Sequence, residues 1–475
     1  MTEEQIDSTR RLGTAVIVGA SIAGSSSAAA LASLFNKVIV IERDALPQGA
    51  EKRRGVPHSG QFHILSAGGA LDLEKIFPGL TEDLQEAGVP YTDPTAGFKY
   101  GSKFGWFARQ PSDMRMLMST RRFLEWTLRR RASEIENVTI IDRSRAQSLV
   151  VEDGRAVGLV VENLDSGESQ VITGDLIIDA SGRPSIAPEW LEAAGYQKPV
   201  ETVIDAKWGY ATTYVEVPED WDPGWVAYYV GPTVSGEGRA ATRGASMWRQ
   251  EGNLMVVTAQ GCAGDRPPTD VDGFMDFISS FGAPEFKDLI EQHGRVTDIE
   301  GWSNTSNRHR DWAGLENRPE GFVVVGDAAA AFNPIYGQGM TLAARGAATL
   351  RTTLAEHLVQ NGDDAGLGGF AERFQNNLQT LVDPAWGFST GSDYAVPGVT
   401  IDGVAQVSEK SPESEYGDRV LALATEDPAI ALKFFETINM VRSTEWMGDE
   451  DLKSRVLGDW DRLGSLKRAD NALTA

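Results

Sequence analysis

The sequence has 475 residues, 44 basic and 68 acidic side chains, and a net charge of −24. A chain of this length is expected to form two or three joined lobes, and its acidity argues against nucleic acid or an anionic membrane surface as a partner. One cysteine, Cys262, excludes an internal disulfide, and the five histidines have no metal-ligand spacing, so we expect no metal. Neither a secretory signal nor a long apolar run is present, which predicts a cytoplasmic protein without a membrane-spanning segment.

The first predicted unit is a strand, a glycine turn, a helix of small residues and a second strand. Gly19 permits the sharp turn, and Gly24 lets the helix approach the sheet. The helix N-terminus offers N–H groups to a pyrophosphate, and Glu42, 23 positions after Gly19, can accept hydrogen bonds from a ribose. The residues expected to bind a nucleotide in this turn are Gly19, Ala20, Ser21, Ile22, Ala23 and Gly24.

Ser21 stands where the dinucleotide-binding pattern has its second glycine. Its small side chain still lets a phosphate approach the backbone. This unit favours a nucleotide site over an ordinary buried βαβ unit, but it does not distinguish NAD, NADP and FAD.

Helical and then extended patterns follow. Apolar periodicity predicts helices over 66–87 and 120–135, and Arg129 to Arg131 are expected to form a solvated cationic face on the second of them. Asp-Gly and Ser-Gly turn pairs between apolar runs predict an antiparallel meander over 145–175. The next strand ends in a small-residue turn, 180–182, which is expected on the nucleotide side of the sheet.

The middle of the chain mixes strand-like segments, 211–217 and 254–259, with turns, much tryptophan and a helix near 271–281. This pattern predicts a β-rich lobe. Its tryptophans, including Trp208, Trp225 and Trp248, and the neighbouring Tyr210 could line an apolar pocket or simply pack the core.

A buried strand near residue 324 ends in Asp327, at the edge where the ligands of parallel sheets bind. A helix N-cap is the alternative role for this carboxylate. Gly337, Gly339 and the start of a helix over 340–360 supply N–H groups that suit the N1–C2=O edge of a flavin.

Together, these motifs resemble those of FAD-dependent monooxygenases with the aromatic-hydroxylase fold. Within them, the chain is similar to the flavin epoxidases that act on polyene precursors of polyether polyketides. The segments that carry the resemblance are 19–24, 42–47, 53–57, 63–65, 179–183, 326–327, 331–340 and 382–386.

The resemblance implies an α/β protein with two lobes, in which a Rossmann-like FAD/NAD(P)-binding domain carries an inserted β-rich substrate lobe and a C-terminal helical region. The expected boundaries are 12–190 and 306–362 for the FAD-binding domain, 191–305 for the substrate lobe and 363–475 for the helical region.

The resemblance also implies roles for single residues. Glu42 would bind the adenosine ribose, and Asp327 the ribityl chain of FAD. The residues expected against the pyrimidine edge of the flavin are Gly337, Gly339 and Met340, and Pro334 is also expected among the cofactor-binding residues. The basic residues that match positions near the adenine, phosphates or ribityl chain are Arg43, Arg53 and Arg121, for which a plain surface role is the alternative. The candidates for shaping the substrate space are Pro334, Tyr336 and His63, the last being a structural histidine or a proton donor.

The implied activity is that of a monooxygenase in which a flavin C4a-hydroperoxide delivers one oxygen atom, so no catalytic side chain is assigned. We expect epoxidation of an alkene in a hydrophobic intermediate of secondary metabolism such as antibiotic biosynthesis, of polyketide or terpenoid-like structure. Hydroxylation of an aromatic ring is the alternative, and a non-catalytic flavin-binding protein is a third. NAD(P)H would reduce the flavin, directly or through a separate flavin or ferredoxin-type reductase.

Two departures from the relatives affect these expectations. The segment 58–63 lacks the arginine and one histidine of their Gln-x-Arg-His-x-His run, which puts a substrate or reductant contact of this loop in doubt. Ala180-Ser181-Gly182 replaces the usual Ala-Asp-Gly, which weakens the case for direct NADPH docking. The Trp-x-Trp-x-Ile-Pro element of flavin halogenases is not found in the sequence.

Overall fold

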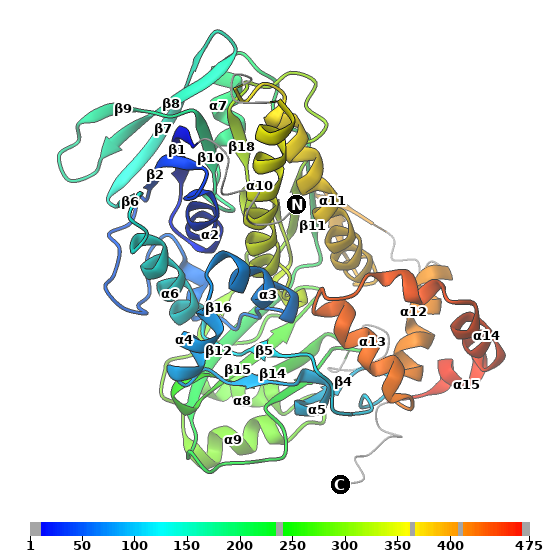
Figure 1. Ribbon diagram of the computed structural model, residues 1–475. Helices are drawn as coiled ribbons and strands as arrows, with labels where there is room; N and C mark the ends of the chain where they lie inside the picture. Colours follow the sequence, from blue (N-terminus) through cyan, green and yellow to red (C-terminus); the bar gives the residue numbers. More distant parts are fainter. Residues whose placement is uncertain (1–10, 234–240, 362–365, 407–411, 468–475) are drawn as a thin grey trace.

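A computed structural model describes residues 11–233, 241–361, 366–406 and 412–467 (Figure 1). Its central sheet has five parallel strands in the order β18-β10-β1-β2-β6. These strands are β1 (Leu12–Val18), β2 (Phe35–Ile41), β6 (Val138–Ile141), β10 (Leu176–Asp179) and β18 (Phe322–Val324). Apart from Leu12 and two isoleucines of the edge strand β6, their apolar side chains are almost fully buried, as expected for a parallel sheet that is covered on both faces.

Helix α2 (Ile22–Leu31) follows β1 and packs against α10 (Gly339–Asn361), the long helix that runs through the middle of Figure 1. Small residues along α2 permit this close packing. Helix α11 (Phe370–Asp393) packs beside α10 and continues through Pro384. The mixed α/β architecture confirms the predicted fold class.

The antiparallel meander consists of β7 (Ser144–Glu152), β8 (Arg155–Asn163) and β9 (Ser169–Thr173), and it projects from one side of the central sheet (Figure 1). Its first turn has both Asp153 and Gly154 in the left-handed region, with φ of 47° and 78°. This is the backbone that an Asp-Gly hairpin turn requires.

The second large sheet has the order β16-β12-β15-β14-β13-β4. Its strands are β4 (Phe98–Gly101), β12 (Gly209–Glu216), β13 (Ala227–Val230), β14 (Arg243–Arg249), β15 (Leu254–Gly261) and β16 (Glu300–Trp302). Alternate side chains face opposite ways: one face packs under α8 (Val271–Ile278) and α9 (Glu285–His293), and the other lines a cavity. Strand β4 lies outside residues 191–305, the segment expected to form the lobe.

A third sheet, with the order β19-β17-β11-β20-β21, is formed by segments far apart in the sequence. Its strands are β11 (Glu201–Asp205), β17 (Asn307–Arg310), β19 (Ala330–Ala331), β20 (Thr400–Ile401) and β21 (Val404–Ala405). The smallest sheet pairs β3 (Tyr91–Thr92) with β5 (Met116–Leu117).

The remaining helices are α3 (Ala67–Ile76), α4 (Leu80–Glu86), α5 (Pro94–Gly97), α6 (Arg121–Ser133), α7 (Ala187–Ala193), α12 (Pro412–Leu423), α13 (Pro428–Ile438), α14 (Glu450–Gly458) and α15 (Trp460–Ser465). Where the periodicity predicted one helix over 66–87, two are found. The chain breaks between them because Gly79 adopts a left-handed conformation with φ of 84° and the carboxylate of Glu74 accepts its N–H. Helices α12 to α15 lie beside the second large sheet (Figure 1) and share an apolar cluster with Phe98 and Trp248.

Candidate FAD site and substrate cavity

The turn after β1 has no room for larger residues at its two glycines. A Cβ on Gly19, whose φ is 99°, would lie 2.6 Å from the carbonyl oxygen of Ala180. A Cβ on Gly24 would lie 1.7 Å from the carbonyl oxygen of Gly19. The chain therefore brings the 180–182 turn and the start of α2 together at the carboxyl ends of β1 and β10. Ser21 is the N-cap of α2 but makes no capping hydrogen bond with its side chain, so the first N–H groups of the helix remain available to a phosphate.

The Ser21 side chain links α2 to α6. Arg121 Nη2 donates a hydrogen bond of 2.7 Å to Ser21 Oγ, which in turn donates one of 3.0 Å to Glu125 Oε2. A glycine at position 21 could make neither bond. The departure from the glycine pattern thus has a structural reason.

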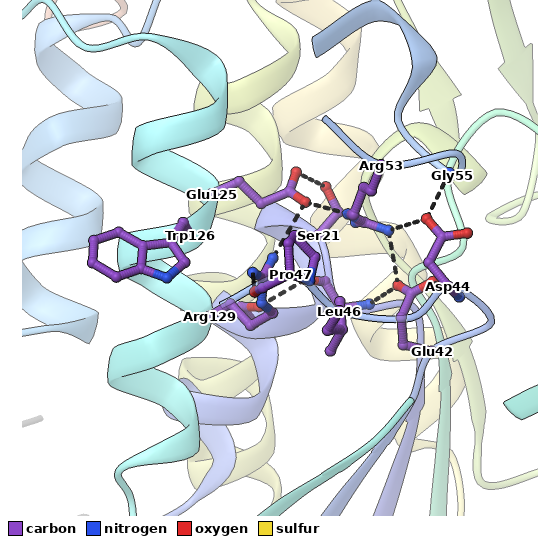
Figure 2. Close-up of polar contacts among 12 residues, drawn as sticks. Ser21, Glu42, Asp44, Leu46, Pro47, Arg53, Gly55, Glu125, Trp126 and Arg129 are labelled. Carbon is purple, nitrogen blue, oxygen red and sulfur yellow. Dashed lines mark hydrogen bonds and ion pairs between the residues drawn. The ribbon is translucent and has the colours of Figure 1, made fainter. Parts of the chain in front are cut away.

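Around Ser21, three carboxylates and three guanidinium groups form a buried ion network (Figure 2). Its charged members are Glu42, Asp44, Arg53, Arg121, Glu125 and Arg129. Arg53 contacts all three carboxylates, at 3.3 Å from Glu42, 2.9 Å from Asp44 and 2.6 Å from Glu125. Burial alone would raise the pKa of Glu125, but Arg121 and Arg53 outweigh it and hold that pKa at about 2. Glu125 is therefore ionised at neutral pH.

Glu42 lies at the end of β2, as predicted, with part of its hydrogen-bonding capacity already used. Its carboxylate accepts the N–H groups of Ala20, at 2.9 Å, and of Asp44, at 3.0 Å. A carboxylate has about four acceptor positions, so it can still accept a ribose hydroxyl.

The predicted arginines differ in environment. Arg53 and Arg121 are in the network, whereas Arg43 is exposed. The expectation of a solvated face at Arg129 to Arg131 was wrong for Arg129, which is buried and donates to the carbonyl oxygen of Pro47 at 2.8 Å. Two further members of the network, Asp44 and Glu125, were not predicted as site residues. For Glu125 a signal existed, because Arg121, Glu125 and Arg129 follow one another at i, i+4 spacing.

Asp327 lies just beyond the end of β18, beside the start of α10. A Cβ on Gly339 would be 3.7 Å from Asp327 Oδ1, so the glycine turn brings the backbone of the helix N-terminus close to this carboxylate. Within the described ranges the Asp327 side chain makes no hydrogen bond, although it is half-buried. Burial raises its pKa, opposed by the nearby charges of Arg183, Arg121 and Arg308. Arg183, which the site prediction did not include, donates to the carbonyl oxygens of Ser306 and Phe332.

The turn that leads into α10 places further polar and backbone groups near Asp327. Gly337 has a φ of 67°, which favours glycine, and a Cβ there would lie 3.1 Å from Ile64. Gln338 Oε1 is buried without a partner among the described residues. The Met340 side chain packs into a core cluster with Ile22 and Leu65, which leaves its backbone as the part that can face a ligand. A ring edge that accepts hydrogen bonds and a hydroxylated chain, both of which FAD has, fit the N–H groups at the start of α10 and the Asp327 carboxylate.

A cavity of about 890 Å³ opens beside this turn. Pro334, Tyr336 and His63 all border it, together with Tyr210 and Trp248 of the second large sheet and Trp208, which directly precedes β12. Helices α11 to α13 complete its walls with mostly apolar side chains, among them Phe388, Leu421, Phe434 and Ile438. Trp225 lies elsewhere, in the core under α8 and α9. The cavity thus has the size and the apolar lining of a small-molecule site.

His63 is not suited to donate a proton at neutral pH. Burial lowers its pKa well below the usual value, and the neighbouring His58 and Arg121 lower it further. His58, whose ring centre is 5.4 Å away, has its pKa lowered to about 4, chiefly by burial and then by Arg121 and Arg183. Both imidazoles are therefore uncharged at neutral pH.

Behind the cavity wall lies one buried carboxylate, Asp393, near the end of α11. It accepts hydrogen bonds from Trp208 Nε1 at 3.0 Å and from Tyr336 Oη at 2.7 Å. Asn307 Nδ2, at 2.7 Å, and Asn333 Nδ2, at 3.1 Å, donate as well. No sequence motif pointed to Asp393.

A model of the FAD binding domain family matches residues 13–385 of this sequence, most of the chain. The chain belongs to that family. Family membership supports FAD as the cofactor and confirms the prediction of a flavin-dependent enzyme. The described part of the chain has no helix that is long and apolar enough to cross a membrane, and no group of metal-binding side chains is found within it.

Among relatives, the chain is 30% identical to Protein Rv3254 of Mycobacterium tuberculosis, over 90% of each sequence. It is 29% identical to kynurenine 3-monooxygenase of Salinispora tropica, over 73% of this chain and 74% of that protein.

Solved structures share the fold at lower identity. A flavoprotein/dehydrogenase from Cytophaga hutchinsonii superposes with a TM-score of 0.65 at 15% identity, covering 95% of this chain and 100% of the other. The myxobacterial chondrochloren halogenase CndH superposes with a TM-score of 0.61 at 17% identity, covering 90% and 94%. These similarities support the fold.

Proposed function

We propose that this protein is an FAD-dependent monooxygenase that inserts one oxygen atom from O₂ into a hydrophobic small molecule. The observation that carries the proposal is the mainly apolar cavity of about 890 Å³ beside the Pro334–Tyr336 turn and the N-terminus of α10. FAD, when bound, would supply the reduced ring that activates O₂. The protein would bind it, exclude water and hold the substrate close to the ring.

In this proposal the cofactor spans two parts of the molecule. Glu42 would accept hydrogen bonds from the adenosine ribose, and the N-terminus of α2 would bind the pyrophosphate. Asp327 would accept from the ribityl hydroxyls, and the backbone N–H groups at Gly339 and Met340 would face the pyrimidine edge. Arg53 and Arg121 would act mainly by fixing Glu42 and Ser21, because their own guanidinium groups are held by carboxylates.

Two reactions are compatible with such a site. The resemblance of the sequence motifs to polyene epoxidases favours epoxidation of an alkene. The similarity to a kynurenine 3-monooxygenase over 73% of the chain supports hydroxylation of an aromatic ring as the second candidate. The reductant would be NAD(P)H, acting directly or through a separate reductase.

The test uses the FAD-loaded protein with NADH or NADPH, alone and with an added flavin reductase. Lipophilic alkenes and phenols are offered in turn while O₂ consumption is recorded, and products are analysed after reaction under ¹⁸O₂. We expect at least one compound to stimulate O₂ consumption and to gain one ¹⁸O atom, as an epoxide or as a ring hydroxyl. If no compound of either class stimulates O₂ consumption above the substrate-free rate, the proposal is wrong.

A further inference from the structure

The phenol and indole groups nearest the Asn333–Tyr336 turn do not direct their protons into the cavity. Trp208 Nε1 and Tyr336 Oη donate to Asp393 Oδ1, at 3.0 Å and 2.7 Å. Tyr210 Oη donates to Asn333 Oδ1 at 3.0 Å. Each of these three side chains borders the cavity. Their donors are therefore used within the protein. The backbone N–H of Ile335 also contacts Tyr210 Oη and the Ser392 hydroxyl contacts Tyr336 Oη, so what these two tyrosines can offer a ligand is a remaining oxygen lone pair.

Asp393 fixes this arrangement from behind the wall. Its side chain is fully buried and does not border the cavity. An ionised carboxylate can only accept hydrogen bonds, so its four neutral donors must point toward it. Two of them, Asn307 and Asn333, also connect it to β17 and to the turn itself. The direction of the Tyr336 proton is thus set by Asp393.

The charge state of Asp393 agrees with this role. Burial raises its pKa to about 6, against the lowering effect of the hydrogen bonds that it accepts. The titratable groups that interact with it within the described part of the chain are Tyr336, Tyr210 and Cys262, and none of them is a cation. Above its pKa the carboxylate is ionised and accepts from Tyr336.

His63 adds a second acceptor to the same cavity. Its Nδ1 lies 2.9 Å from the carbonyl oxygen of Gln61, which can only accept, so Nδ1 carries the ring proton. Because the ring is neutral, Nε2 keeps its lone pair. Two donors without partners among the described residues, Trp248 Nε1 and Gln260 Nε2, lie instead on the sheet wall formed by β14 and β15.

We propose that the cavity binds its substrate through a hydroxyl or N–H group that donates a hydrogen bond to Tyr336 Oη, with Asp393 as the positioning residue that keeps this oxygen an acceptor. The inference rests on the proposed function and narrows its substrate class. The substrate is an apolar molecule that carries a phenol, an enol or an amine, whether the oxidised carbon belongs to a ring or to an alkene. His63 Nε2 is placed to accept from a second such group.

Binding of a matched pair of ligands tests the proposal without any turnover. 2-Naphthol and 2-methoxynaphthalene have the same ring system, but only the first can donate a hydrogen bond. Their dissociation constants are measured at neutral pH on the FAD-loaded protein, from the quenching of tryptophan fluorescence and from changes in flavin absorbance. We expect 2-naphthol to bind about tenfold more tightly, because the ether leaves a buried acceptor unpaired.

Three variants locate the effect. In Tyr336→Phe the two ligands should have about equal dissociation constants, because the preference for 2-naphthol is lost while the ether binds as in the wild type. In Asp393→Asn the preference should also fall, because an amide can donate to Tyr336 and turn its proton toward the cavity. Tyr91→Phe, which removes a hydroxyl from an exposed tyrosine outside the cavity, should leave both constants unchanged. Circular dichroism and the unfolding midpoint confirm that each variant folds.

The proposal is overturned if the two ligands bind equally to the wild-type protein, if neither binds, or if the preference persists in Tyr336→Phe. Its failure differs from failure of the proposed function. Oxygenation of a molecule without a donor group would contradict the inference and leave the monooxygenase intact. A clear preference for 2-naphthol without any substrate-stimulated O₂ consumption would support the inferred binding mode and contradict the proposed monooxygenase function.

Discussion

The two ends of the candidate site stabilise buried carboxylates in opposite ways. Near Ser21, three carboxylates are balanced by three arginines, and Glu125 stays ionised with a pKa of about 2. Near the cavity, Asp393 is surrounded by neutral donors, and its pKa rises to about 6. The first arrangement keeps Glu125 charged across the physiological pH range. The second can change its charge near pH 6.

The largest effect is expected when the balance of the ion network is broken. Arg53→Ala would leave three buried carboxylates facing two arginines, and removal of one partner from a buried ion pair costs about 3–5 kcal/mol of unfolding free energy. Urea denaturation measures this loss. The neighbouring Arg54 is exposed, so Arg54→Ala should stay within about 0.5 kcal/mol of the wild type. Similar stability of the two variants would contradict the network as described.

The next effect concerns Asp393 and pH. Its pKa is raised on folding from 3.8 to about 6, so the folded protein binds the proton more tightly and stability falls as pH rises between these values. The wild type should lose about 3 kcal/mol relative to Asp393→Asn between about pH 3 and pH 8, most of it between pH 4 and pH 6. Unfolding midpoints of both proteins across this range measure the difference. Parallel curves would show that Asp393 titrates normally.

A smaller effect is expected at Asp327. If this carboxylate accepts from the ribityl hydroxyls, Asp327→Asn should weaken FAD binding by about 2 kcal/mol, or roughly 30-fold. The cofactor-free variant should unfold close to the wild-type midpoint, because the Asp327 side chain makes no hydrogen bond within the described ranges and the cost of its burial opposes the attraction of the nearby arginines. Titration with FAD, followed by quenching of flavin fluorescence, measures the affinity. Asp220→Asn, at an exposed position, is the matched control.

The smallest effect is expected at Ser21. Ser21→Gly restores the glycine pattern but removes the bonds to Arg121 and Glu125, so it should destabilise the protein by about 1 kcal/mol without tightening FAD binding. Ser21→Ala separates the loss of the hydroxyl from the added backbone freedom of glycine. Tighter FAD binding by Ser21→Gly would contradict this expectation and show that the serine weakens cofactor binding.

The sequence predicted the features that depend on local pattern. Apolar periodicity and turn residues predicted the parallel strands, the glycine turns and the helix over 340–360. The structure has all of them. The turn at Gly79 was missed because apolar spacing continues across it.

Side-chain networks were beyond prediction for a different reason. The ion network joins residues from β2, the loop at 53 and α6, and Asp393 meets partners 57 to 185 positions away. Such contacts depend on tertiary packing, which no spacing rule encodes. The neutral state of His63 could not be predicted either, since it follows from burial.

Strand β4 has a consequence for how the chain folds. Residues 98–101 pair in parallel with β13, residues 227–230, which are made well over a hundred residues later. During synthesis, this edge strand therefore cannot pair with β13 until the second large sheet has been made. A fragment that ends near residue 190 would expose it, and one that begins there would lack it. We expect the two lobes to fold as one cooperative unit and separately expressed halves to aggregate.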